Sequence, residues 1–79
     1  MFYVYVLRSL RNSRLYIGQT ENLNRRIEEH NSGRSQATRY QGPYQIVRVE
    51  YFSTREVALK RERFLKTGKG REQLKILGL

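Results

Sequence analysis

Hydrophobic and polar positions divide the chain into six structural segments. Phe2–Leu7 is an uninterrupted aromatic and β-branched run, which predicts a strand buried on both faces. The turn residues Arg11–Ser13 follow, and Leu15–Ile17 returns as a second strand that ends at Gly18, so the two segments predict a β-hairpin. Ile46–Phe52 has the same character and predicts a third strand.

The first predicted helix lies between the second and third strands. Asn22 is its expected N-cap, and its apolar stripe runs through Leu23, Ile27 and His30. Gly33 is expected to stop it in the left-handed conformation that glycine tolerates. A polar loop over residues 34–43 then leads to the third strand.

Two more helices are predicted after the third strand. The first of them starts at a capping box, in which the Ser53 hydroxyl accepts the amide of Glu56, and it ends near Gly68. Gly70 loosens the chain before a short last helix over Arg71–Leu77. The order ββαβαα favours an α/β (α+β) fold, in which a three-stranded antiparallel sheet is flanked by three helices, as a single domain over residues 1–79.

Composition excludes several classes of site. The chain has 79 residues, no cysteine, one histidine and seven acidic residues that are all glutamate. Disulfides, cysteine zinc ribbons, thiol nucleophiles, two-imidazole sites, Ser–His–Asp triads and Asp-rich two-metal clusters are therefore not expected. No membrane segment or targeting peptide is visible, so we expect a cytoplasmic protein that does not act at a membrane.

The charge indicates the class of partner. Twelve arginines and four lysines give a formal net charge of +9. Arginine offers a planar fork of donors to phosphate oxygens, so the balance favours a nucleic acid. A solvated basic surface, or a ribosome- or RNA-associated basic protein, is the alternative.

Three ionisable residues fall on or beside apolar helical stripes. Arg26 and His30 share a face with Leu23 and Ile27, and Glu62 lies one turn from buried positions of the second helix. Such groups are rarely buried without a partner. Each also has a structural interpretation, which sequence alone leaves open: Arg26 extends to solvent, Glu62 pairs with Arg26 or Arg61, and His30 satisfies a backbone carbonyl.

Two tyrosines join this set. Strand alternation places Tyr5 on one face of the first strand, and Tyr16 lies on the neighbouring strand. Phenols, a guanidinium, an imidazole and a carboxylate are the parts needed for phosphodiester hydrolysis: a carboxylate for a divalent cation, a phenol or imidazole for a proton, and arginine for transition-state charge. A single candidate acid favours one metal over two.

The tyrosine triplets match a known family. Tyr3-Val4-Tyr5, a hairpin and then Tyr16-Ile17-Gly18 resemble the paired signature of the GIY-YIG nuclease superfamily, although Tyr3 and Val4 replace the glycine and isoleucine of the first triplet. Further matching positions follow in the family's order, namely Arg26 ten residues after Tyr16, His30 one turn later, the Ala-x-x-x-Glu element at Ala58 and Glu62, and Lys66.

The resemblance extends from Phe2 to about Leu77. Glu29–Gly33 looks like the loop entry of small stand-alone bacterial members, and the chain is similar to the nuclease domain of the excision-repair incision subunit. The resemblance implies a central three-stranded antiparallel sheet and a Mg²⁺- or Mn²⁺-dependent DNA endonuclease with one metal, in a setting such as DNA repair.

The resemblance also implies residue roles. Glu62 would ligate the cation, and Arg26 would hold the scissile phosphate. Tyr5 or Tyr16 would act as the general base or orient the water, a choice that spacing leaves open. His30 would assist proton transfer or phosphate binding. A phenol of ordinary pKa near ~10 would need that pKa lowered by nearby cations to act as a base.

We expect no added recognition domain, so affinity would come from the basic surface with low sequence discrimination. Activity could then depend on DNA structure or on a protein partner for targeting. The residues expected to contact DNA are Arg25, Arg34, Arg39, Lys60, Lys66, Lys69 and Arg71. The alternative for the helical part of this set is a solvated face with intrahelical ion pairs. The alternative function is a non-catalytic nucleic-acid-binding module on the same scaffold.

Overall fold

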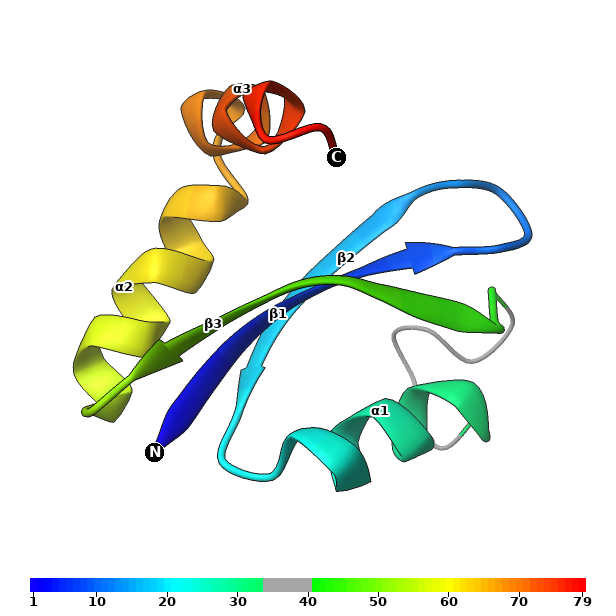
Figure 1. Cartoon of the computed structure of the whole chain (residues 1–79), viewed down its shortest axis with the longest axis horizontal. Coiled ribbons are helices and arrows are strands. Elements are labelled where there is room, and N and C mark those ends of the chain that lie inside the picture. Colours follow the sequence, from blue (N-terminus) through cyan, green and yellow to red (C-terminus); the bar gives the residue numbers. More distant parts are fainter. Residues whose placement is uncertain (34–40) are drawn as a thin grey trace.

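The computed structural model describes residues 1–33 and 41–79, and it confirms the predicted fold class and element order. The three strands form one antiparallel sheet in the order β2-β1-β3. The elements in chain order are β1 (Phe2–Ser9), β2 (Leu15–Thr20), α1 (Leu23–Asn31), β3 (Tyr44–Phe52), α2 (Arg55–Leu65) and α3 (Gly68–Ile76) (Figure 1).

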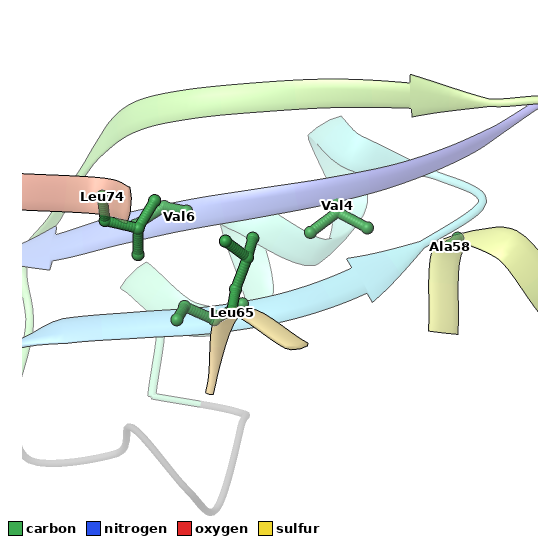
Figure 2. Packing of buried hydrophobic residues seen from close by; sticks show 6 residues of the cluster. Val4, Val6, Ala58, Leu65 and Leu74 are labelled. Carbon is green, nitrogen blue, oxygen red and sulfur yellow. The ribbon is translucent and has the colours of Figure 1, made fainter. Parts of the chain in front are cut away.

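The sheet separates two apolar clusters, because side chains alternate between its faces. On one face Val4, Val6 and Ile17 pack against residues of α2 and α3 (Figure 2). On the other face Tyr5 and Leu7 pack with residues of α1 and β3. Figure 1 accordingly has α1 on one side of the sheet and α2 and α3 on the other. The prediction that β1 is buried on both faces is confirmed.

Strand ends differ from the prediction where pairing partners lie far along the chain. β2 continues through Gly18 to Thr20, because it stays in register with β1 as far as the Tyr3–Thr20 pair. β3 begins at Tyr44 instead of Ile46, since Tyr44 pairs with Ser9 at the other end of β1. The prediction that Gly18 ends the strand is wrong.

Helix α1 has the predicted boundaries. The Asn22 side chain caps it by accepting the backbone amide of Arg25 at 3.1 Å. Gly33, at φ 79°, has the left-handed conformation expected of a stop. The predicted loop over residues 34–43 falls largely on residues 34–40, which lie outside the described residues.

Helix α2 begins one residue later than predicted, and helix α3 begins three residues earlier. Thr54, not Ser53, caps α2 by accepting the amide of Val57, because the chain needs one more residue to turn out of β3. Thr67 caps α3 by accepting the amide of Gly70, so that helix starts at Gly68 and not at Arg71. These glycines are therefore part of the helix and not a break before it.

Candidate active site

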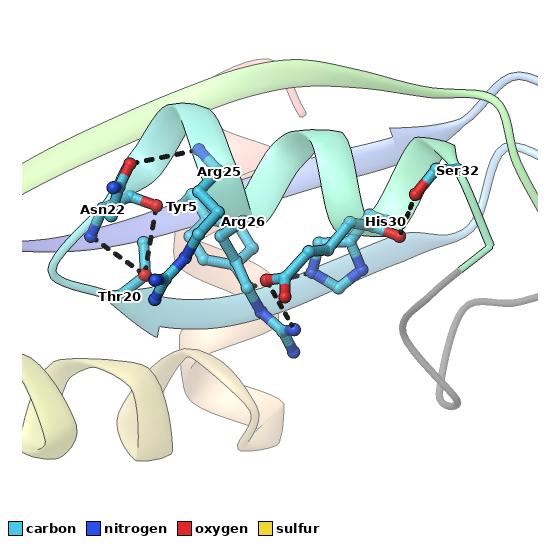
Figure 3. Close-up of polar contacts among 8 residues, drawn as sticks. Tyr5, Thr20, Asn22, Arg25, Arg26, His30 and Ser32 are labelled. Atoms are coloured by element: carbon cyan, nitrogen blue, oxygen red, sulfur yellow. Dashed lines mark hydrogen bonds and ion pairs between the residues drawn. The ribbon is translucent and has the colours of Figure 1, made fainter.

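A buried phenol joins three of the predicted site residues. The Tyr5 side chain is 1% exposed, and its hydroxyl lies 3.0 Å from Nε2 of His30 and 3.3 Å from Nε of Arg26 (Figure 3). A guanidinium can only donate, so Arg26 donates to the phenol oxygen. This leaves the phenol's own proton for Nε2 of a neutral imidazole. The three side chains thus form one hydrogen-bonded unit between α1 and β1.

Aromatic rings enclose the imidazole. The His30 side chain is 1% exposed, and its ring centroid lies 4.8 Å from that of Tyr16, 5.7 Å from that of Tyr5 and 6.0 Å from that of Tyr44. Tyr16 stacks on Tyr5 at 6.4 Å and is only half-buried. Of the two candidate phenols, Tyr16 is therefore the one that solvent and a ligand reach.

Local sequence explains how this cluster forms. Arg26 and His30 are four residues apart, so α1 presents both on the face that packs against the sheet. Gly18 pairs with Tyr5 across the β1–β2 ladder, and a Cβ there would come within 2.4 Å of the Tyr5 hydroxyl oxygen. The glycine of the second triplet thus leaves the space that the phenol occupies.

Burial sets the protonation states of the cluster. It raises the pKa of Tyr5 to about 12, although the hydrogen bond and charge of Arg26 act in the opposite direction. Burial also lowers the pKa of His30 to about 4, and the positive charge of Arg26 lowers it further. At neutral pH both residues are uncharged. The expectation that nearby cations lower the phenol pKa is not met at Tyr5 by the chain's own residues.

The carboxylate comes from the opposite face of the sheet. Glu62 lies on α2, and its side chain is 18% exposed and accepts a hydrogen bond from Lys66 Nζ at 2.8 Å. The charge of Glu62 contributes to the raised pKa of Tyr5, so its field reaches the phenol. Neither pairing considered from the sequence is found: Arg61 pairs with Glu50, and Arg26 lies 3.5 Å from Glu29.

The described basic residues predicted to contact DNA are all exposed, and they are distributed over the three helices. They are Arg25 on α1, Lys60 on α2, Lys66 at the end of α2, and Lys69 and Arg71 on α3. Lys66 is partly committed to Glu62, an intrahelical pair with lysine in place of the arginine expected for a solvated face. Arg34 and Arg39 lie outside the described residues.

Sequence reasoning missed two features around the cluster. No sequence motif marks Tyr44 as a site residue, yet its ring completes the enclosure of His30. Arg55 likewise belongs to no motif of the sequence, yet it lines one groove with Arg25 and Arg26. No local signal identifies Arg55, because its proximity to α1 depends on how α2 packs on the sheet.

The donor set fits a hard cation with few protein ligands. Within residues 1–33 and 41–79 no three His, Cys, Asp or Glu side chains gather closely enough to form a metal cage. Mg²⁺ is commonly held by one or two carboxylates, with water and substrate phosphate oxygens completing its shell. Glu62, a partly buried carboxylate whose field reaches the phenol, fits that pattern.

A phenol–imidazole–guanidinium cluster on a small basic domain, with a carboxylate whose charge reaches the phenol, offers groups suited to phosphodiester cleavage. The family model of the GIY-YIG catalytic domain matches residues 1–75, and the chain belongs to this nuclease family, whose members act on nucleic acid.

Relatives of known sequence are small proteins of similar length. The chain is 36% identical to the UPF0213 protein CPE1444 of Clostridium perfringens over 78 residues, which cover 98% of this chain and 83% of that protein. It is 42% identical to the UPF0213 protein HQ_3675A of Haloquadratum walsbyi over 66 residues, covering 82% and 73% of the two chains.

A solved structure has the same fold. The solution structure of the UPF0213 protein BH0048 from Bacillus halodurans is 34% identical in sequence to this chain. The match covers 98% of this chain and 85% of that protein, with a TM-score of 0.59.

Within residues 1–33 and 41–79 of this chain, no helix is long and apolar enough to cross a bilayer.

Proposed function

We propose that this protein is a divalent-metal-dependent endonuclease that hydrolyses phosphodiester bonds in DNA with low sequence specificity. The observation that carries the proposal is the convergence of Tyr5, Tyr16, Arg26 and His30 on one spot, with the charge of Glu62 acting on that spot from α2. A purely structural core has no need for a buried phenol and imidazole hydrogen-bonded to a half-buried guanidinium, because polar groups are unfavourable in a core unless they are compensated.

The chain's own residues divide the work as follows. Arg26, 32% exposed, binds the scissile phosphate through the guanidinium nitrogens that Tyr5 does not hold. Tyr5 and His30 are positioning residues, because they are buried, uncharged and fix the orientation of Arg26. Tyr16, as the accessible phenol, first loses its own proton to solvent, and the resulting phenolate orients the attacking water and takes its proton.

Glu62 would hold the cation, with substrate phosphate oxygens and water as the other ligands. When bound, the cation supplies Lewis-acid stabilisation of the charge that develops on the phosphate. Lys66 donates to Oε2 of Glu62, and an i,i+4 pair of this kind is weak enough to give way to a cation.

Nicking of supercoiled plasmid tests the proposal. We expect nicks with Mg²⁺ or Mn²⁺, none with a chelator, and a loss of about 10²-fold or more in rate for Glu62→Gln and Arg26→Gln. Glu72→Gln on α3 is the matched control, since it removes the same charge from an exposed position. Cleavage that survives chelation, or that is equal in all variants, would contradict the assignment.

One observation favours the alternative of a non-catalytic binding module. Lys66 places an ammonium 2.8 Å from Oε2 of the carboxylate that a metal would need. In a pure binder no metal displaces Lys66, so Mn²⁺ would not alter the DNA affinity of either the wild type or Glu62→Gln, and no nicks would form. An increase in DNA affinity on adding Mn²⁺ that disappears in Glu62→Gln would exclude this alternative.

A further inference from the structure

We propose that the groove between the start of α1, the end of β2 and the first turn of α2 binds a second phosphate of the nucleic-acid strand whose scissile phosphate lies at Arg26. The inference rests on the proposed function for the position of that first phosphate. The groove has a volume of about 440 Å³. It is lined by Gln19, Thr20, Glu21, Arg25, Arg26, Glu29 and Arg55.

The charges in the groove favour an anion. Three guanidiniums face two carboxylates, and the carboxylates of Glu21 and Glu29 are engaged with Arg55 and Arg26 respectively. Among the described residues, the exposed Arg25 side chain has neither an ion pair nor a hydrogen bond, so one positive charge is left over. A phosphate brought to the groove therefore meets an uncompensated guanidinium.

Arg55 can exchange its ion pair with Glu21 for a hydrogen bond to a phosphate. Its side chain is 52% exposed and that of Glu21 is 59% exposed, and ion pairs in such solvated positions contribute little free energy. The guanidinium carbon of Arg55 also lies 5.1 Å from the centroid of the Phe2 ring, a cation–π contact. Because the ring holds the guanidinium in place, Arg55 can release Glu21 and donate to a phosphate without losing its position.

The groove adjoins the candidate active site, and this indicates which ligand it binds. Arg26 lines the groove and also donates to Tyr5, so one guanidinium borders both sites. A ligand that spans them needs repeated negative charges along an extended chain, as in a nucleic-acid backbone. Contacts of this type fix register and carry little sequence information. Arg55 is thus a positioning residue for the strand, and Glu21 competes with the strand for it.

Substitutions of Arg55 and of its ion-pair partner Glu21 test the second phosphate site, because they should change DNA affinity in opposite directions. We expect Arg55→Gln to weaken binding of a fluorescein-labelled DNA duplex by roughly three- to tenfold and to reduce the slope of log K against log salt by about one. We expect Glu21→Gln to tighten binding, because it frees Arg55 and removes a negative charge. In cleavage, Arg55→Gln should raise KM and leave kcat within about twofold, because it removes binding that is equal in ground and transition states.

Two variants control for net charge. Arg14→Gln makes the same charge change in the hairpin turn at the other end of β2, and Glu72→Gln matches Glu21→Gln on α3. Effects no larger than those of the matched controls would overturn the second phosphate site. So would weaker binding in both groove variants, since an ion pair needed only for folding predicts a loss in each.

The two proposals fail separately. If the groove variants shift affinity in opposite directions but the wild-type protein does not nick plasmid with Mn²⁺, the nuclease activity is refuted and the phosphate site stands. If plasmid is nicked but the groove variants behave like their controls, the nuclease stands and the groove assignment is refuted.

Discussion

At the scale of single residues, burial decides which groups of the candidate site carry charge. His30 is the only histidine, and its pKa of about 4 in the fold lies below the ordinary 6.5. Tyr5 is held protonated by the same burial. These two side chains therefore act through hydrogen bonds and not through charge, and Arg26 is the cation of the cluster.

Acid should destabilise the protein through His30. Because its pKa is lower in the folded state, the unfolded state binds more protons between about pH 6.5 and 4, and stability falls as pH falls through that window. Each pKa unit corresponds to 1.36 kcal/mol, so about 2 kcal/mol should be lost by pH 5. Urea unfolding at pH 7 and pH 5 measures this. The stability of His30→Gln should be nearly flat over the same range, and an equal loss in that variant would refute the cause.

The two phenols should respond differently to loss of the hydroxyl. Tyr16→Phe should reduce the cleavage rate by about 10²-fold or more with little change in stability, because its hydroxyl works on the substrate. Tyr5→Phe should cost about 1–3 kcal/mol of stability, because it leaves Nε of Arg26 and Nε2 of His30 without this partner. Single-turnover rates and urea unfolding separate the effects, and the reverse pattern would make Tyr5 the base.

At the scale of elements, α3 is held on α2 by a close approach at one glycine. A Cβ at Gly70 would lie 2.1 Å from the backbone oxygen of Phe64 and 2.5 Å from Cα of Leu65. Neither atom can move away without shifting α2. The pair of helices then covers the sheet with Ala58, Leu65 and Leu74 (Figure 2). The position of α3 on α2 depends on this contact.

Gly70→Ala should therefore separate the two helices. We expect a loss of about 1–3 kcal/mol or more in the free energy of unfolding, as for overpacked cores. Gly68→Ala is the matched control in the same helix, because a Cβ there meets nothing within 4 Å, and alanine favours helix. Urea unfolding measures the stability of both variants, and equal stabilities would contradict the close packing of α3 on α2.

At the scale of the whole molecule, the excess of positive charge determines how DNA binding depends on salt. With a formal net charge of +9, the affinity for DNA should come mainly from phosphate contacts and counterion release. We expect log K to fall linearly with log salt, by about 0.9 for each phosphate contacted. Fluorescence anisotropy from low to moderate salt measures the slope. An affinity that does not change with salt would rule out phosphate contacts as the driving force.

The sequence by itself determined the sheet, the order of the elements and the α1 side of the candidate site. The reason is that these features depend on local periodicity: strand alternation places Tyr5, and a four-residue helical spacing places Arg26 with His30. The family motifs identified the same residues because their spacings record this geometry. The cap of α1 and the left-handed Gly33 are equally local.

Only the tertiary structure decided what depends on contacts between distant segments. The full lengths of β2 and β3 follow from pairing with β1, and the packing of α3 on α2 follows from the close approach at Gly70. Contacts between distant segments also decide which residue pairs with Glu62 and why the pKa of Tyr5 is raised. They also place Arg55 in the same groove as Arg25. Burial, electric field and groove shape are sums over many residues, so no short stretch of sequence specifies them.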